Sequence, residues 1–368
     1  MKNNRTFLEK LLDGAEIEWK PLMDLAEIGT GNSNRQDEEE NGKYPFYVRS
    51  KNILRSNSFQ FDETAIIIPG EGGIGDIFHY VEGKYALHQR AYRIHITSDQ
   101  VNTKFLYYIM HNSFKKYILS KSVGATAISI RKPMLEKFEI PIPPFSVQTE
   151  IVRILDALTA LTSELTSELI LRQKQYEYYR EKLLSFDSLE QLNSGGGGKK
   201  KLIDVAKIKN GKDWKHLGEG NIPIYGSGGI MGYVDAYSYD KPTVLIPRKG
   251  TITNIFYLEE PFWNVDTIYY TEIDTTQILP KYFYHFMKTV DLTKLDTGSG
   301  RPSLTQAILN EIPIFVPSIE EQQRIVSILD KFETLTNSIT EGLPLAIEQS
   351  QKRYEYYREL LLSFNGSN

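Results

Sequence analysis

Residues 173–186 of this chain read QKQYEYYREKLLSF, and almost the same segment returns as QKRYEYYRELLLSF at residues 351–364. Twelve of the fourteen positions are identical. A match of this length, at a spacing of 178 residues, indicates an internal duplication, which has to be recognised before any single motif is interpreted. We therefore expect two copies of one structural unit in a chain of 368 residues.

The composition is that of an ordinary globular protein. With 40% hydrophobic and 24% charged residues, the chain is long enough for two domains with cores of their own. The absence of cysteine excludes a disulfide scaffold, a thiolate metal site and a cysteine nucleophile, and it agrees with a cytoplasmic location. The sequence has neither a signal-peptide pattern nor an uninterrupted apolar run of about eighteen residues, so we expect neither export nor a membrane span.

The net charge of −4 at first argues against a nucleic-acid partner. Counted by region, however, residues 1–150 carry 19 basic and 19 acidic side chains, and residues 193–317 carry 14 and 13. The excess of acid therefore lies mainly in the segments between and after these two regions. A basic face on either of the two regions remains open.

Short runs of β-branched and aromatic residues between turn residues predict strands in both halves. In the first half they are residues 44–50, 65–70, 76–81 and 91–96, followed by a helix at 105–119. In the second half they are residues 222–227, 243–250, 254–258 and 266–273, followed by a helix at 282–290. The order is the same, but the residues in the loops differ. A shared frame with different loops suggests one kind of task on two different targets.

Each half ends in a long helix. From residue 151 to 186, apolar residues recur at alternating steps of four and three, interrupted only by Thr162 and Arg172, which predicts a coiled-coil seam and a rod of roughly 54 Å at 1.5 Å per residue. The second seam, residues 325–364, contains a four-residue insertion beside Gly342 and Pro344, where we expect a kink or a break. A short helix at residues 4–12 is similar to the tail of the repeated helix and suggests a cyclic order of domain and helix.

We find no catalytic motif in the sequence. GEGGIG at residues 70–75 has the spacing of a dinucleotide-binding loop but precedes a predicted strand instead of a helix. IPPF at residues 142–145 resembles the motif of amino-methyltransferases, yet Ile142 stands where an Asn or Asp would be needed. The six histidines, at positions 79, 88, 95, 111, 216 and 285, form no ligand pair in the sequence, so we expect structural roles and no metal site.

Polar and basic residues in the loops of both halves form the candidate DNA-binding set. Arginine reads guanine bidentately in the major groove, while lysine, serine and threonine hold phosphates. The candidates are Arg49, Ser50, Lys51, Arg55, Arg90, Arg93, Thr126, Ser129 and Arg131 in the first half, and Lys209, Lys212, Ser227, Arg248, Lys249, Arg301 and Ser303 in the second.

The repeated tyrosines admit seam packing as well as contact with a partner. The candidate partner-interface residues are Tyr176, Tyr178, Tyr179, Arg180, Tyr354, Tyr356, Tyr357 and Arg358.

The duplicated plan, with EIPIPP and EIPI before the helices, EEQQRIVSILD at residues 320–330 and YEYYRE at the far ends, resembles the specificity subunit of type I restriction-modification systems. That resemblance implies an α+β chain, with two β-rich α/β target recognition domains joined by two long antiparallel coiled-coil-like helices. It places an N-terminal helix and the first recognition domain at 1–145, the first spacer helix at 146–192, a flexible linker at 193–201, the second domain at 202–317 and the second spacer helix at 318–365.

The same resemblance implies a non-catalytic, DNA-binding subunit. Each domain would read one half of a split site in double-stranded DNA, and the helices would set the spacer and dock two methyltransferase subunits. S-adenosylmethionine, ATP and Mg would belong to the methyltransferase and restriction subunits, with no cofactor in this chain. A DNA-binding regulator acting alone and a specificity subunit of a type IIB-like system are the alternatives.

Overall fold

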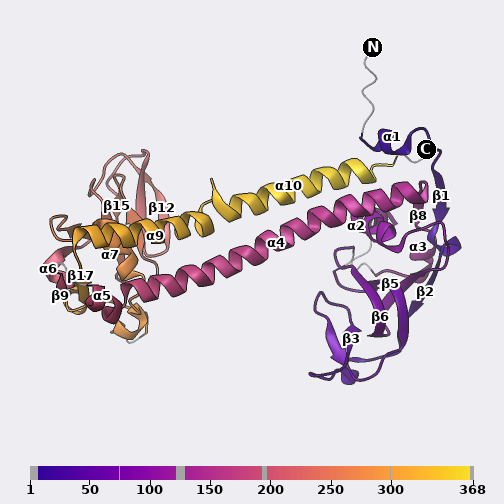
Figure 1. Ribbon diagram of the computed structural model, residues 1–368, viewed down its shortest axis with the longest axis horizontal. Coiled ribbons are helices and arrows are strands. Elements are labelled where there is room, and N and C mark those ends of the chain that lie inside the picture. Colours follow the sequence, from indigo (N-terminus) through magenta and orange to yellow (C-terminus); the bar gives the residue numbers. More distant parts are fainter. Residues whose placement is uncertain (1–6, 74, 122–128, 193–196, 299, 365–368) are drawn as a thin grey trace, which may run out of the picture. The chain divides into compact units, whose positions relative to one another are not determined.

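The computed structural model describes residues 7–73, 75–121, 129–192, 197–298 and 300–364. The chain divides into two compact units, drawn in Figure 1: unit 1 comprises Met1–Glu164 and Ile347–Asn368, and unit 2 comprises Leu165–Ala346. The long helix α4 begins in unit 1 and ends in unit 2. No helix in the described ranges is long and apolar enough to cross a membrane.

Unit 1 is built on a six-stranded sheet with the order β2-β7-β5-β6-β3-β4. Its neighbours are antiparallel except for β3 and β6, which run parallel. A separate two-stranded ladder joins β1 and β8. The strands are β1 (Glu18–Pro21), β2 (Ala26–Thr30), β3 (Tyr44–Tyr47), β4 (Leu54–Ser56), β5 (Phe61–Pro69), β6 (His79–Leu87), β7 (Ala91–Ile96) and β8 (Glu139–Ile142).

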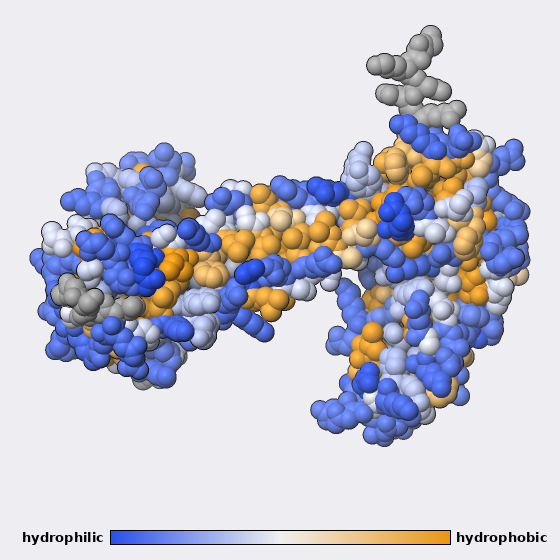
Figure 2. Space-filling model, in the orientation of Figure 1, coloured by the Kyte–Doolittle hydropathy of each residue, from blue (hydrophilic) through white to orange (hydrophobic). Residues whose placement is uncertain are grey.

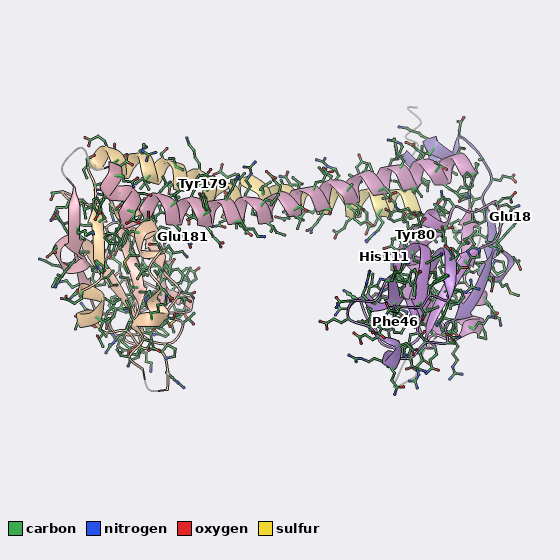
Figure 3. The ribbon with its side chains drawn as sticks, turned by 60° about the horizontal axis from the view of Figure 1, so that its bottom comes forward. Glu18, Phe46, Tyr80, His111, Tyr179 and Glu181 are labelled. Atoms are coloured by element: carbon green, nitrogen blue, oxygen red, sulfur yellow. The ribbon has the colours of Figure 1, made fainter. Side chains whose placement is uncertain are left out.

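Helices cover one face of this sheet. α2 packs on β5, and the core between them contains Ile66, Ile94, Phe105 and Phe114, all fully buried. Tyr80 of β6 and His111 of α2 lie on this side, both beside the ring of Tyr107 (Figure 3). The helices of unit 1 are α1 (Phe7–Leu12), α2 (Thr103–Lys121), α3 (Lys132–Glu136), the first part of α4 (Phe145–Leu184) and most of α10 (Gly342–Leu362).

Unit 2 repeats the strand pairings of unit 1. β10-β16-β13 matches β2-β7-β5, the parallel pair β11 and β15 matches β3 and β6, and the ladder of β9 with β17 matches β1 with β8. Its strands are β9 (Gly198–Lys201), β10 (Ala206–Lys209), β11 (Ile222–Gly226), β12 (Gly229–Val234), β13 (Thr243–Pro247), β14 (Phe256–Leu258), β15 (Trp263–Asn264), β16 (Ile268–Ile273) and β17 (Pro313–Val316). Its helices, besides the end of α4, are α5 (Phe186–Leu192), α6 (Leu202–Val205), α7 (Pro280–Met287), α8 (Gln306–Asn310) and α9 (Ile319–Asn337).

Most predicted strands and both predicted domain helices are present. The prediction for residues 76–81 is wrong at its start, because β6 begins only at His79. The preceding Gly72, Gly73 and Gly75 have φ angles of 71°, 54° and 70°, which turn the chain before the strand. The short strands β1, β9 and β17, which pair across long sequence distances, were not predicted.

The expected interruption of the second long helix is confirmed. α9 ends at Asn337 and α10 begins at Gly342, so four residues, 338–341, lie outside both helices. Gly342 has a φ of 80°, and a Cβ there would lie 2.6 Å from the carbonyl oxygen of Thr334. The first helix also stops once, at Ser185 between α4 and α5.

The expected flexible linker at residues 193–201 needs a correction. Residues 193–196 are outside the described part of the chain, but Gly198–Lys201 form β9, which is paired along its full length with β17. Backbone pairing therefore removes the last four residues from the linker. Glycine and lysine composition alone could not reveal this, because the partner strand lies more than 100 residues further along the chain.

A buried glutamine ties each long helix to its domain. Gln148 Oε1 accepts the backbone N–H of Asn102 (2.9 Å), while its Nε2 donates to the carbonyl oxygens of Gln100 (2.8 Å) and Pro143 (2.9 Å). In unit 2, Gln322 makes the same three bonds, with Leu279 N–H (2.8 Å), Gln277 O (3.0 Å) and Pro317 O (2.9 Å). Both side chains are 0% exposed. Each amide thus joins the segment before a domain helix to the start of α4 or α9.

We expect Gln148→Leu and Gln322→Leu to destabilise the protein. Each substitution removes three hydrogen bonds and leaves buried backbone groups without a partner, at a cost of about 1–3 kcal/mol per group. The neighbouring Thr149 and Gln323 are exposed, so Thr149→Leu and Gln323→Leu serve as controls and should stay within about 0.5 kcal/mol of the parent. Urea unfolding measures both effects. Equal stability of Gln322→Leu and Gln323→Leu would contradict this role.

Candidate nucleic-acid interface

Three loops of unit 1 meet at the end of β5. The backbone N–H of Gly70 donates to Arg90 O (2.9 Å), and Gly70 O accepts the N–H of Ile130 (2.9 Å). Glu71 and Ser129 form an isolated antiparallel bridge beside these bonds. We call this meeting point junction 1. It brings the loop after β5, the turn before β7 and the segment before α3 to one edge of the unit.

The side chains of junction 1 form a charged group. Glu71 Oε2 accepts from Arg49 Nη1 at 2.9 Å and from Arg90 Nη1 at 3.3 Å. Arg49, Ser50, Glu71 and His88 are among the residues that line a cavity of about 430 Å³. An edge of this kind can offer cationic donors, a carboxylate and a hydroxyl to a polar ligand.

His88 closes the inner side of junction 1. It is 8% exposed and stacks against Phe46, which lies in the sheet (Figure 3), at 6.5 Å between ring centroids. Burial, and then the positive charges of Arg49 and Arg90, lower the pKa of His88 below its ordinary value of 6.5. The ring is therefore neutral at pH 7. Its Nδ1 accepts the backbone N–H of Arg90 (3.0 Å), which places the ring proton on Nε2.

Unit 2 contains the same backbone junction. Leu304 N–H donates to Arg248 O (2.8 Å), Arg248 N–H donates to Thr267 O (2.8 Å), and Lys249 bridges to Ser303. Ser227 joins it through its N–H, which donates to Thr267 Oγ1 (3.3 Å). We call this meeting point junction 2. It has the architecture of junction 1 with different side chains.

A carboxylate orders the loop that completes junction 2. Asp296 Oδ1 accepts the backbone N–H groups of Ser303 (2.7 Å) and Gly298 (2.8 Å). These two bonds lower the pKa of Asp296 below its ordinary value. The carboxylate is therefore ionised at neutral pH and holds the loop that carries Arg301 against the end of β13, where Gly250 N–H donates to Pro302 O (3.1 Å).

The structure gathers part of the predicted DNA-binding set at the junctions. The residues at or next to junction 1 are Arg49, Ser50, Arg90, Ser129 and Arg131, and those at or next to junction 2 are Ser227, Arg248, Lys249, Arg301 and Ser303. Lys51 is exposed in the loop after β3, and Lys212 follows β10, where its N–H donates to Asn264 O (2.9 Å). Thr126 lies outside the described residues.

Arg93 is wrong as a DNA contact. Its side chain is 8% exposed, its Nη1 donates to both carboxylate oxygens of Glu63 (2.9 and 3.1 Å), and its Nη2 pairs with Glu27. These bonds lie within the sheet and leave the guanidinium unavailable to a ligand. Arg93 is a structural residue of β7.

Arg55 and Lys209 are also engaged elsewhere. Arg55 Nε donates to Gly42 O (2.8 Å) and thereby fastens the segment before β3 to β4. Lys209 Nζ lies 3.3 Å from Glu272 on the neighbouring strand. Neither side chain belongs to a junction.

Sequence reasoning missed Glu71 and His88, since neither belongs to a basic pattern. One signal was present: Glu71 and Lys249 are separated by 178 residues, the spacing of the duplication, and differ in sign of charge. A comparison of the two copies position by position would have pointed to this site.

The predicted partner-interface residues separate into buried and exposed groups. Tyr176 is 7% exposed and stacks on Phe332 at 6.4 Å between ring centroids, so its assignment to an external interface is corrected to packing inside unit 2. Burial, and then the charge of Glu333, raises the pKa of Tyr176 to about 12. Tyr354, its counterpart, is partly buried against the core of unit 1.

The exposed members of this group are Tyr178 and Tyr356, at 57% and 62%, and to a lesser degree Tyr179 at 39%. Tyr179 lies on the part of α4 that belongs to unit 2, as does Glu181 (Figure 3). Tyr357 is partly buried, with its ring edge-on to Phe7 at 6.5 Å. Arg180 and Arg358 lie over the rings of Tyr176 and Tyr354, and the Nε of each is buried without a hydrogen-bond partner in the structure.

A hydrophobic hollow adjoins Tyr356. A cavity of about 490 Å³ between α1 and the end of α10 is lined by Leu8, Leu12, Leu360 and Phe364 together with Tyr356. Hydrophobic surface is visible over these elements at this end of unit 1 in Figure 2. Apolar surface rimmed by polar residues is typical of a protein contact.

One cluster in unit 2 has the composition of a metal site. The ligand atoms of His285, Asp330 and Glu333 lie within 4.8 Å of one another. His285 Nε2 lies 2.8 Å from Asp330 Oδ1, Lys281 Nζ lies 3.1 Å from Asp330 Oδ2, and Tyr284 O–H donates to Glu333 (3.1 Å). The Lys281 ammonium would repel a metal cation at this place. The arrangement fits a polar network that joins α7 to α9.

Two copies of one β-rich domain, each with a loop-built polar edge, define the class of this protein. The chain belongs to the family of type I restriction-modification DNA specificity proteins: the family model "Type I restriction modification DNA specificity domain" matches residues 15–172 and again residues 197–349. These specificity subunits are non-catalytic. The double match agrees with the repeated topology of the two units.

The chain is similar over its full length to known specificity subunits. It is 42% identical to a Haemophilus influenzae protein described as a type I restriction enzyme specificity subunit, covering 99% of this chain and 100% of that protein. It is 32% identical to the EcoprrI specificity subunit of Escherichia coli, with 91% and 92% covered. The crystal structure of an S subunit from M. genitalium has the same fold, with a TM-score of 0.63, 21% identity, and 100% and 99% covered.

We expect Asp330→Asn to lower the melting temperature at pH 7. Burial raises the pKa of Asp330, but the hydrogen bonds from His285 and Lys281 lower it more, so the net pKa is below 3.8. A carboxyl group whose pKa is lower in the folded state than in the unfolded state stabilises the fold at pH values above its unfolded-state pKa. This stabilisation is lost as the pH falls through the folded-state pKa. The difference in melting temperature between the variant and the parent should therefore shrink below a pH of about 3.8.

Melting curves followed by circular dichroism at pH 7 and at acidic pH test this expectation. Asp240 is exposed in the same unit, so Asp240→Asn is the matched control. A difference that is independent of pH would show that Asp330 does not act through its charge.

Proposed function

We propose that this chain is the sequence-specificity subunit of a type I restriction-modification complex, in which each unit reads one half of a bipartite site in double-stranded DNA. The observation that carries this proposal is the junction of three loops, built twice on the same backbone hydrogen bonds with different side chains. A backbone frame shared by both units, with different side chains, suits the recognition of two ligands of the same kind.

Cations near the junctions support a duplex as that ligand. Lys51, Arg131, Lys249 and Arg301 are exposed, and none has an ion-pair partner within the described ranges. Exposed cations without partners can neutralise backbone phosphates and release counterions. The net charge of −4 therefore does not exclude DNA binding.

The long helices would set the distance between the half-sites and bind the methyltransferase subunits. A helix of 40 residues such as α4 extends about 60 Å at 1.5 Å per residue, which exceeds the roughly 34–36 Å between half-sites one DNA turn apart. We assign the antiparallel packing of the long helices to the spacer. Within unit 1, Thr162 Oγ1 of α4 lies 2.8 Å from Ser350 Oγ of α10, and within unit 2, Tyr179 of α4 stacks on Phe332 of α9 at 5.8 Å.

Two methyltransferase subunits would dock on the exposed Tyr178 and Tyr356, the latter beside its apolar hollow. They would supply S-adenosylmethionine and methylate adenine. Restriction subunits would supply ATP- and Mg-dependent cleavage. This chain would contribute the choice of sequence alone.

The function is tested by sequencing methylated bases in the genome of the source organism with and without this gene. We expect a split adenine motif that is methylated only when the gene is present. Reintroducing the gene should restore it. A motif that persists after deletion, or a dependent motif without two separated halves, would contradict the proposal.

The gap between α9 and α10 provides a second test. The four residues 338–341 lie where the second seam carries four residues more than the first. Deleting them should alter the number of unspecified bases between the half-sites and leave both half-sites unchanged, because the junctions are untouched. The same methylome measurement reads both properties. A changed half-site with a constant spacer would assign these residues to base reading instead.

A further inference from the structure

Junctions 1 and 2 carry opposite charges at one equivalent position. Gly70 O accepts the N–H of Ile130, and Arg248 O accepts the N–H of Leu304, at 2.9 and 2.8 Å. The next residue in each case forms an isolated bridge, Glu71 with Ser129 and Lys249 with Ser303. Glu71 and Lys249 therefore occupy the same place in the two copies of the fold.

Two flanking positions are equivalent by the same criterion. Gly70 N–H donates to Arg90 O, and Arg248 N–H donates to Thr267 O, so Arg90 corresponds to Thr267. Arg49 follows the last residue of β3 by two positions, and Ser227 follows Tyr225 of β11 by two, in strands with equivalent pairings. Triad 1 is Arg49, Glu71 and Arg90. Triad 2 is Ser227, Lys249 and Thr267.

Fold stability does not explain triad 1. The side chains of Arg49, Glu71 and Arg90 are 44%, 49% and 56% exposed, and ion pairs this exposed contribute little to stability. Backbone bonds already hold the junction without them. The pairs orient the two arginines, because one carboxylate oxygen of Glu71 accepts from both guanidinium groups. Arg49 and Glu71 also line the 430 Å³ cavity.

We propose that triads 1 and 2 are the base-discriminating groups of the two units, and that Glu71 is a positioning residue that aims Arg49 and Arg90 at guanine. This inference rests on the proposed function. Arginine donates two parallel bonds to O6 and N7 of guanine in the major groove, a geometry that an oriented guanidinium reaches most readily. Triad 2 offers one ammonium and two hydroxyls, so it prefers a different base pair.

The test exchanges the triads. The variant Arg49→Ser, Glu71→Lys, Arg90→Thr gives unit 1 the side chains of triad 2. Expressed in the source organism in place of the parent chain, it should change one or two base positions in one half-site and leave the other half-site and the spacer unchanged. Discrimination for the original base should fall roughly 5- to 150-fold, the range of one bidentate arginine contact.

A control makes the same acid-to-lysine exchange as Glu71→Lys at a position away from junction 1. Asp62 lies on the same strand β5, 4.0 Å from Lys84, with its side chain 56% exposed. Asp62→Lys should leave the methylated motif as in the parent. A triple variant that methylates the parental motif, or alters both half-sites, would overturn the assignment of the triads. The proposed function would stand in that case, because the motif would still depend on this chain.

Loss of all methylation in the triple variant would be resolved by milder changes. Glu71→Gln keeps the volume and removes the charge, so it should relax the choice of base at the position read by triad 1, while Glu71→Asp should retain that choice in part. Urea unfolding of the purified chains establishes that they are folded. A folded Glu71→Gln chain that discriminates like the parent would refute the positioning role.

Discussion

The buried amides of Gln148 and Gln322 are the constraint on which the arrangement of each unit depends. Each satisfies three backbone groups from segments that no regular element pairs: the loop before a domain helix and the residue between the last strand and the long helix. Burying a polar group without hydrogen bonds is costly, and these amides avoid that cost. The direction in which α4 and α9 leave their domains is therefore set by these two side chains.

Junctions 1 and 2 also share one backbone arrangement. The same backbone hydrogen bonds join the loops in both units, so residues such as Glu71 and Lys249 can differ without a change in these bonds. Under the proposed function, this separation would let duplication yield two specificities from one architecture. Glu71 and Lys249 show it most directly, since opposite charges occupy one position without a change in the surrounding bonds.

The repeated YEYYR segments of α4 and α10 have a buried face and an exposed face. Tyr176 packs inside unit 2 and Tyr354 against the core of unit 1, whereas the residues two positions later, Tyr178 and Tyr356, are exposed. Helical periodicity turns residues two apart to different faces. The repeated YEYYR segment therefore serves two purposes at once, packing on one face and offering aromatic surface on the other.

The sequence alone determined the duplication, the long helices, the interruption before Gly342 and most strands, because each of these depends on spacing along the chain. It could not determine that Arg90 faces a junction while Arg93, three residues later, is locked to Glu63 within the sheet. Nor could it reveal that Gly198–Lys201 form a strand or that Glu71 holds two arginines. Those facts depend on pairings between residues far apart in the chain, which only the tertiary structure brings together.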